Sequence, residues 1–198
     1  MTNVTFLVFR TFFITIMTVG MMASLTDFRF GRRKLLYILA VYSIWVIASS
    51  MGLLKIGGEL LLLRLFFLTI SLPATFLTYW AANDTPAQAV FNYTTQIMVS
   101  TLSASMIRWL TECFGLSAFV NILLMGVFYF TVIYLEWRFL RQPFRMLMQI
   151  IPGRWGVLTL IPCVFCLYLI LVSAWPTSYL ECFPQRVYVY TAIIPLIF

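Results

Sequence analysis

The sequence predicts an all-α, polytopic transmembrane helical bundle with six full spans and a truncated seventh. Of the 198 residues, 63% are hydrophobic and only 10% are charged, against about 25% charged in an average soluble domain. The apolar residues gather into long stretches, and the mean hydropathy is +0.99. A soluble fold of this length leaves roughly a third of its surface in water. Such a fold could not hide this much apolar surface.

The spans follow from the length of each apolar stretch, because a helix needs about 20 apolar residues to cross the hydrocarbon core. Six stretches meet or approach that length: 4–25, 35–54, 60–82, 89–110, 116–137 and 155–174. A seventh stretch, 187–198, is still apolar where the sequence stops, but its 12 residues are too few to cross a bilayer. We expect a fragment cut inside its last span, with a re-entrant segment as the alternative.

Lysine and arginine residues set the expected orientation, because cytoplasmic loops carry an excess of them. Eight of the 13 lie in the first and fifth loops: Arg29, Arg32, Arg33, Lys34, Arg138, Arg141, Arg145 and Arg154. Four lie toward the other side: Lys55, Arg64, Arg108 and Arg186. We therefore expect a multi-pass protein of the cell (plasma) membrane with its amino terminus outside. The net charge of +7 is interpreted as this loop bias, and no nucleic-acid partner is expected.

Catalytic and metal-binding motifs are missing from the sequence. It contains no histidine, only six acidic residues and no glycine-rich phosphate loop. Without histidine there is neither an imidazole base nor a histidine metal ligand. We expect no catalytic residue, no metal and no cofactor. Glu136 is the acid closest to mid-membrane, at the cytoplasmic end of the fifth span beside Arg138, so a proton-driven pump is not expected.

The fourth predicted span is the most polar one. One face carries Thr94, Met98, Thr101, Ser105 and Arg108, and nearly the opposite face carries Asn92, Gln96, Val99 and Ser103. Because lipid satisfies no hydrogen bond, we expect protein on all sides of this helix. Interhelical packing is one interpretation, and a ligand-lined central helix is the other. In the fifth span, Asn121 is expected to form an interhelical hydrogen bond.

Arg10 lies about two turns inside the outer end of the first span, where an unpaired arginine costs about 1–3 kcal/mol. It either snorkels to the outer headgroups or points inward and pairs with Glu59, Glu112 or Glu181. In the second case it could form an anionic-ligand site with Arg64 and Arg108. The candidate ligand-binding residues are Arg10, Arg64, Arg108, Glu112 and Glu181.

The four cysteines fall into two pairs. Cys113 and Cys182 lie in outer loops and are candidates for a disulfide if their Cα atoms come within about 7 Å. Two free thiols are the alternative. Cys163 and Cys166 have CxxC spacing but lie inside the sixth span. With no histidine and no second CxxC pair, we expect small packing residues there rather than a zinc site.

The fifth loop has a periodic pattern in which Arg138, Gln142, Arg145 and Gln149 recur at i, i+4, i+7 and i+11. Apolar residues fill the positions between them, and Pro143 allows a bend. This pattern predicts a basic amphipathic segment lying on the anionic inner leaflet. Docking of a cytoplasmic domain is the alternative.

Several loop patterns suggest a family. The Trp175-Pro176-Thr177 turn, the following Glu181 and Pro184, the Ile194-Pro195 pair and the basic fifth loop share a pattern with one group of receptors. Together they resemble the membrane-sensing amino-terminal region of Gram-positive GHKL-type sensor histidine kinases, which include AgrC-like peptide-pheromone receptors. The resemblance implies a six- or seven-helix sensor, a homodimer and a following cytoplasmic kinase domain. The kinase's phosphoacceptor histidine and ATP-binding boxes are absent from this sequence.

The expected function is therefore the signal-input domain of a two-component sensor histidine kinase. An extracellular signal would bias the helix arrangement, and the last helix would relay that bias to a kinase domain absent from this chain and then to a response regulator. A small-solute transporter or permease component is the alternative, with Pro73 and Pro162 as candidate kinks.

Overall fold

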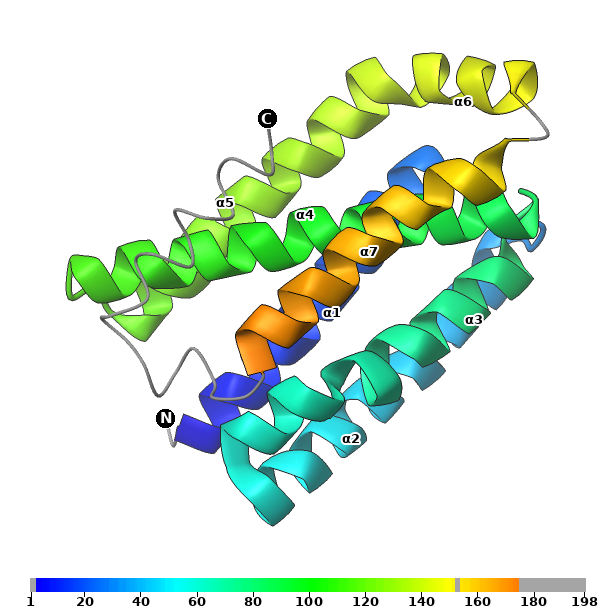
Figure 1. Cartoon of the computed structure of the whole chain (residues 1–198). Coiled ribbons are helices and arrows are strands. Elements are labelled where there is room, and N and C mark those ends of the chain that lie inside the picture. Colours follow the sequence, from blue (N-terminus) through cyan, green and yellow to red (C-terminus); the bar gives the residue numbers. More distant parts are fainter. Residues whose placement is uncertain (1–2, 152–153, 175–198) are drawn as a thin grey trace.

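The regular secondary structure of the described residues is helical, apart from one isolated bridge between Phe28 and Ala82. In this computed structural model, residues 3–151 and 154–174 are described, with the backbone alone for Asn3, Glu112 and residues 169–174. The α-helices are α1 (Asn3–Leu25), α2 (Arg32–Phe66), α3 (Leu72–Ala81), α4 (Pro86–Cys113), α5 (Ala118–Leu135), α6 (Arg141–Ile150) and α7 (Trp155–Ala174) (Figure 1). Two π-helical turns, η1 (Phe67–Ser71) and η2 (Glu136–Leu140), join α2 to α3 and α5 to α6. The all-α prediction is confirmed.

A glycine pair folds α2 and α3 into an antiparallel hairpin. Gly57 and Gly58 have non-helical backbone angles, and Gly58 has φ +67°, a left-handed conformation that glycine adopts without a Cβ clash. The two legs are tied by the Tyr42 hydroxyl, which donates to the Ile70 carbonyl oxygen at 2.9 Å, and by the Trp45 indole, which donates to the Thr69 carbonyl oxygen at 2.8 Å. The predicted second and third spans are the two legs of this hairpin.

The predicted number of spans is wrong. Among the described residues, three helical stretches are long and apolar enough to cross a membrane: Val4–Leu25, Arg32–Ala81 and Ala118–Ile150. The 50-residue middle stretch contains both legs of the hairpin, which the glycine bend joins. α4 is 28 residues long but is too polar to qualify, and the described apolar part of α7, Trp155–Tyr168, is too short. The predicted segment 187–198 lies outside the described residues.

The first and fifth loops meet at one end of the bundle, which we call the basic end. Asp27, between α1 and α2, accepts a hydrogen bond from Arg141 at 3.1 Å and forms an ion pair with Arg145. The Asn83 backbone N–H, between α3 and α4, donates to the Asp27 carbonyl oxygen at 2.9 Å. The predicted placement of both arginine-rich loops on one side is therefore consistent with the fold.

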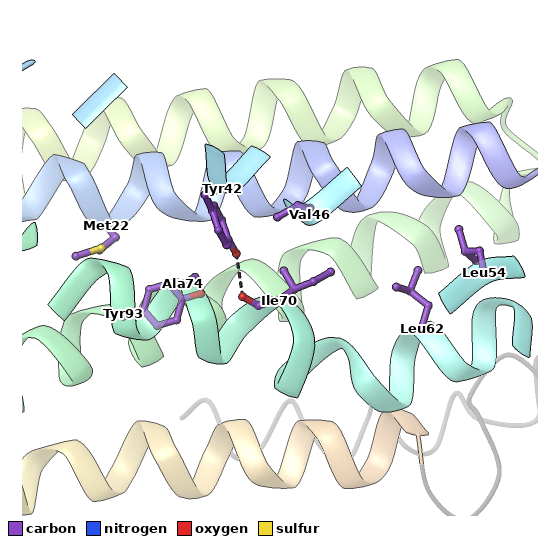
Figure 2. Packing of buried hydrophobic residues seen from close by; sticks show 8 residues of the cluster. All are labelled: Met22, Tyr42, Val46, Leu54, Leu62, Ile70, Ala74 and Tyr93. Carbon is purple, nitrogen blue, oxygen red and sulfur yellow. Dashed lines mark hydrogen bonds between the residues drawn. The ribbon is translucent and has the colours of Figure 1, made fainter. Parts of the chain in front are cut away.

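Buried apolar side chains form two clusters on either side of α1. Figure 2 shows the first cluster, in which the two legs of the hairpin face α1 and α4: Met22, Tyr42, Val46, Leu54, Leu62, Ile70, Ala74 and Tyr93. The second joins α1, α4 and α5: Met21, Ala104, Ile107, Met125 and Tyr129. Large apolar side chains also cover the outside, among them Tyr37, Ile44, Phe119, Phe130 and Ile161. An apolar exterior of this extent suits lipid rather than water.

The amphipathic segment of the fifth loop is helical, as predicted. It forms α6, which bends away from α5 after η2 (Figure 1). Its apolar face packs inward through Phe144, whose ring lies 6.4 Å from that of Phe91, and through the buried Met148. Met146 and Ile150 are exposed. Its position on a lipid leaflet stays a prediction.

Candidate functional site

A cavity of about 160 Å³ opens between α1, α2, η1, α4 and α7, near the end of the bundle opposite the basic end. Most of its wall is apolar. The polar side chains in the lining come from four of these elements: Arg10, Thr11, Glu59, Ser71, Thr101 and Ser105. An apolar hollow with a few convergent polar groups is the usual form of a small-molecule site, so this cavity is the candidate site.

A partly buried ion pair closes one side of the cavity. Arg108 Nη1 of α4 lies 2.7 Å from Glu59 Oε1, and the two side chains are 18% and 26% exposed. Glu59 follows directly on Gly58, so the glycine bend is what brings this carboxylate to α4. The sequence analysis named Glu59 as a possible partner for Arg10, and the structure shows a hydrogen bond from Arg108 to its carboxylate.

The structure brings only part of the predicted ligand set together. Arg10 lines the cavity from α1, which fits the inward orientation rather than snorkelling, and Arg108 reaches it through Glu59. Arg64 lies on α2 after the bend but does not line the cavity. Glu112 belongs to the last turn of α4, and its side chain is not described. Glu181 lies outside the described residues.

The cysteine predictions have different outcomes. Cys113 is exposed, but its predicted partner Cys182 lies outside the described residues, so the disulfide stays a prediction. Cys166 is buried, lines the cavity and donates from its thiol to the Thr94 carbonyl oxygen at 3.3 Å. This position matches the packing interpretation of the CxxC pair.

α4 packs against protein along most of its length, as its polar residues predict, although Met106 is 53% exposed. Its two polar faces have different surroundings. Thr101 and Ser105 face the cavity. On the other face, Asn92 is 1% exposed and donates from its amide to the Thr26 hydroxyl at 2.7 Å. The face with Asn92 therefore packs against other helices, and the face with Thr101 and Ser105 lines the cavity. The predicted interhelical bond of Asn121 is confirmed, since its amide donates to the Thr111 hydroxyl at 2.9 Å.

Glu136, which the sequence analysis placed at the cytoplasmic end of the fifth span, is a carboxylate buried among protein side chains. It is 6% exposed, whereas its neighbour Arg138 is exposed. The Ser24 hydroxyl lies 2.7 Å from Glu136 Oε2, and the Gln96 amide donates to Glu136 Oε1 at 2.8 Å. Glu136 is the first residue of η2, and π-helical turns often occur at functional positions. The spacing of Asn92 and Gln96 hinted at a buried face, but nothing local pointed to Ser24.

Hydroxyl groups continue from the cavity into the bundle. A smaller adjoining cavity of about 30 Å³ shares Ser71 and Thr101 with the first and adds Thr15, Thr18 and Ser100 among its lining residues. The Thr18 and Ser100 hydroxyls are hydrogen-bonded at 2.7 Å, and Ser100 lies 2.8 Å from the Tyr129 hydroxyl. Ser100 is one helical turn along α4 from Gln96, so these hydroxyls extend part of the way from the cavity toward Glu136, with no hydrogen bond between the two groups among the described residues.

Asp84 is a second unusual acid, in the loop between α3 and α4 at the basic end. Burial raises the pKa of its carboxyl group above the ordinary value. Its Oδ2 atom has no hydrogen-bond partner among the described residues.

Asp84 and Glu136 therefore differ in the number of hydrogen bonds that the surrounding residues make to the buried carboxyl group. Glu136 accepts hydrogen bonds from two side chains, whereas burial is the cause of the raised pKa of Asp84.

No protein-family model, curated protein sequence or solved structure matches this chain.

Proposed function

We propose that this chain is the membrane-embedded signal-input domain of a two-component sensor histidine kinase, acting as a receptor. A small ligand occupies the cavity near the outer end, and the basic end faces the cytosol, where a kinase domain would follow. The loop patterns that resemble GHKL-type sensors support this proposal, and so does the distribution of arginine and lysine. The homodimer and the response regulator belong to the same proposal.

The observation that carries the proposal is that the cavity and the basic end share two helices. α1 contributes Arg10 to the cavity and Ser24 to the Glu136 site. α4 contributes Thr101 to the cavity and Gln96 to the Glu136 site. A ligand that separates or rotates α1 and α4 must therefore disturb the contacts of η2 as well.

The mechanism is a population shift between two packings of α1 and α4. A ligand shifts such an equilibrium only by its difference in affinity for the two states. Moving a population from 1:99 to 99:1 needs about 5.5 kcal/mol of difference, and smaller signals need less. In the second packing, the bonds that Ser100 makes with Thr18 and that Gln96 makes with Glu136 in this structure would be broken.

The test measures whether filling the cavity moves the basic end. Spin labels are placed at Arg33 and Met146, both exposed at the basic end, in a cysteine-substituted chain in lipid nanodiscs. Ser105→Trp fills the cavity, and Met106→Trp adds the same ring at the next position of α4, which is 53% exposed. We expect S105W to change the label-to-label distance distribution and M106W to leave it unchanged. An unchanged distribution in folded S105W protein would contradict the proposal.

Transport is a second candidate, and the hydroxyl row between the cavity and Glu136 favours it. A buried acid reached through side-chain hydroxyls is one arrangement used to move protons across a membrane. Proteoliposomes containing a pH-sensitive dye distinguish the two functions. Under the receptor proposal, the chain adds no proton flux. A flux that Glu136→Gln abolishes and Arg138→Gln preserves would replace the receptor by a transporter.

A further inference from the structure

The size of the cavity limits the part of an occupant that it can enclose to one small group. Its volume is about 160 Å³, close to the roughly 150 Å³ of an engineered cavity that binds benzene. Sites for drug-sized molecules are about 300–1,000 Å³. A whole peptide cannot be enclosed here, whereas a single ring or a short branched hydrocarbon can.

The lining combines an apolar wall with polar groups that suit a carboxylate. Leu62, Phe66 and Ile97 supply apolar surface from α2 and α4. Arg10 supplies a guanidinium group, whose planar donors match the two oxygens of a carboxylate. The hydroxyl of Ser105 adds a donor from the facing helix.

The charges around the cavity favour an anion over a cation. Glu59 is the acidic side chain among the described lining residues, and Arg108 already donates to it at 2.7 Å. A cationic ligand would have to compete with Arg108 for this carboxylate. An anionic ligand would instead add a negative group to a cavity lined by Arg10, beside a glutamate that is already bonded to Arg108.

From these three observations we infer that the cavity binds a small monocarboxylate with a compact apolar body. This inference rests on the proposed function, in which the cavity is the ligand site of a receptor. The same chemistry, a carboxylate on an apolar body, is offered by a soluble aromatic acid and by a fatty acid from the bilayer. The compact volume favours the soluble acid.

The test uses three probes of nearly one shape and different charge: benzoate, benzamide and benzamidine. Their binding to the full chain in zwitterionic nanodiscs is measured by saturation-transfer NMR at pH 7.4. We expect benzoate to bind at least about tenfold more tightly than benzamide or benzamidine, because hydrogen bonds between charged partners are stronger than neutral ones. Octanoate and octanamide form the matching pair for a fatty acid from the bilayer. If benzoate binds more tightly than octanoate, the ligand is a soluble aromatic acid, and the reverse order identifies a fatty acid.

Variants assign the selectivity to the cavity. Arg10→Gln should remove the preference for benzoate over benzamide, and Ser105→Trp should abolish binding of both. Lys55→Gln removes a positive charge from an exposed position outside the cavity and should change neither affinity. Because the charge series needs no substitution, the inference stays testable even if R10Q folds poorly.

Three results would overturn the inference. Equal affinity for benzamide would mean that only apolar volume is recognised, and a preference for benzamidine would mean that Glu59 dominates. Absence of binding by both carboxylates would exclude this ligand class. None of these results decides the receptor proposal, because the spin-label distances measure the effect of filling the cavity without any ligand.

Discussion

The buried carboxylate of Glu136 gives the sharpest test of the packing between α1, α4 and η2. Glu136→Gln keeps the shape of the side chain and removes its charge, whereas Glu136→Ala removes both acceptors. In E136Q, the new amide oxygen can still accept from Gln96. The new amide nitrogen can donate to the Ser24 oxygen, because the single Ser24 proton can turn to the Met21 carbonyl oxygen, which lies 2.6 Å away.

The expected magnitudes follow from these contacts. A hydrogen bond to a charged group contributes about 1.5–3 kcal/mol, and a buried donor left without a partner costs about 1–3 kcal/mol. E136A loses the bonds from Ser24 at 2.7 Å and Gln96 at 2.8 Å and leaves the Gln96 amide unpaired. We expect E136A to lower the free energy of unfolding by about 2–4 kcal/mol. E136Q should stay within about 1 kcal/mol of the parent, because it keeps both contacts.

The assay is equilibrium unfolding in mixed micelles, followed by tryptophan fluorescence and circular dichroism. Arg138→Ala is the matched control, since it changes an exposed residue of the same π-helical turn and should shift the unfolding free energy by less than about 0.5 kcal/mol. If E136Q were as destabilising as E136A, the charge itself would be required, and the hydrogen-bonding account of this site would be refuted.

Three further predictions concern the ion pair, the second acid and the orientation. A double-mutant cycle of Glu59→Gln and Arg108→Gln should give a coupling energy of about 1–3 kcal/mol by the same unfolding assay, and strict additivity would exclude a stabilising pair. Burial raises the pKa of Asp84, so its charged form lowers stability, and this cost appears as pH rises from the unfolded value of 3.8 through the folded pKa. Asp84→Asn should therefore raise the melting temperature at pH 7 and have no effect near pH 3, whereas an equal effect at both values would contradict burial as the cause. A single cysteine at Lys34 should react with an impermeant maleimide only after bacterial cells are opened, and one at Ile56 should react in intact cells; the reverse pattern would invert the proposed orientation.

The sequence predicted the helical class and several polar contacts, because apolar periodicity and isolated polar residues report directly on a lipid-facing helix. The enclosure of α4 and the bond of Asn121 followed from this reasoning. The number of spans did not, because apolar length alone counted 35–54 and 60–82 separately, and also counted the polar α4 and the short apolar part of α7 as spans.

The candidate site was only partly predictable for a different reason. Arg10 was singled out by its depth alone, and the structure places it in the cavity. The pairing of Glu59 with Arg108 depends on where the glycine bend directs the chain. The burial of Glu136 depends on Ser24, which is 112 residues away in the sequence. Contacts of this separation leave no local pattern, so they could not be read from spacing.

The bonds of α4 also bear on the order in which the protein can be assembled during synthesis. A chain emerging from the ribosome delivers α4 to the translocon before Glu136 has been made. Until η2 arrives, the Gln96 amide lacks the acceptor that it has in the finished bundle. Nascent chains ending before residue 136 should therefore hold α4 beside the insertion machinery, and chains that extend beyond α6 should release it.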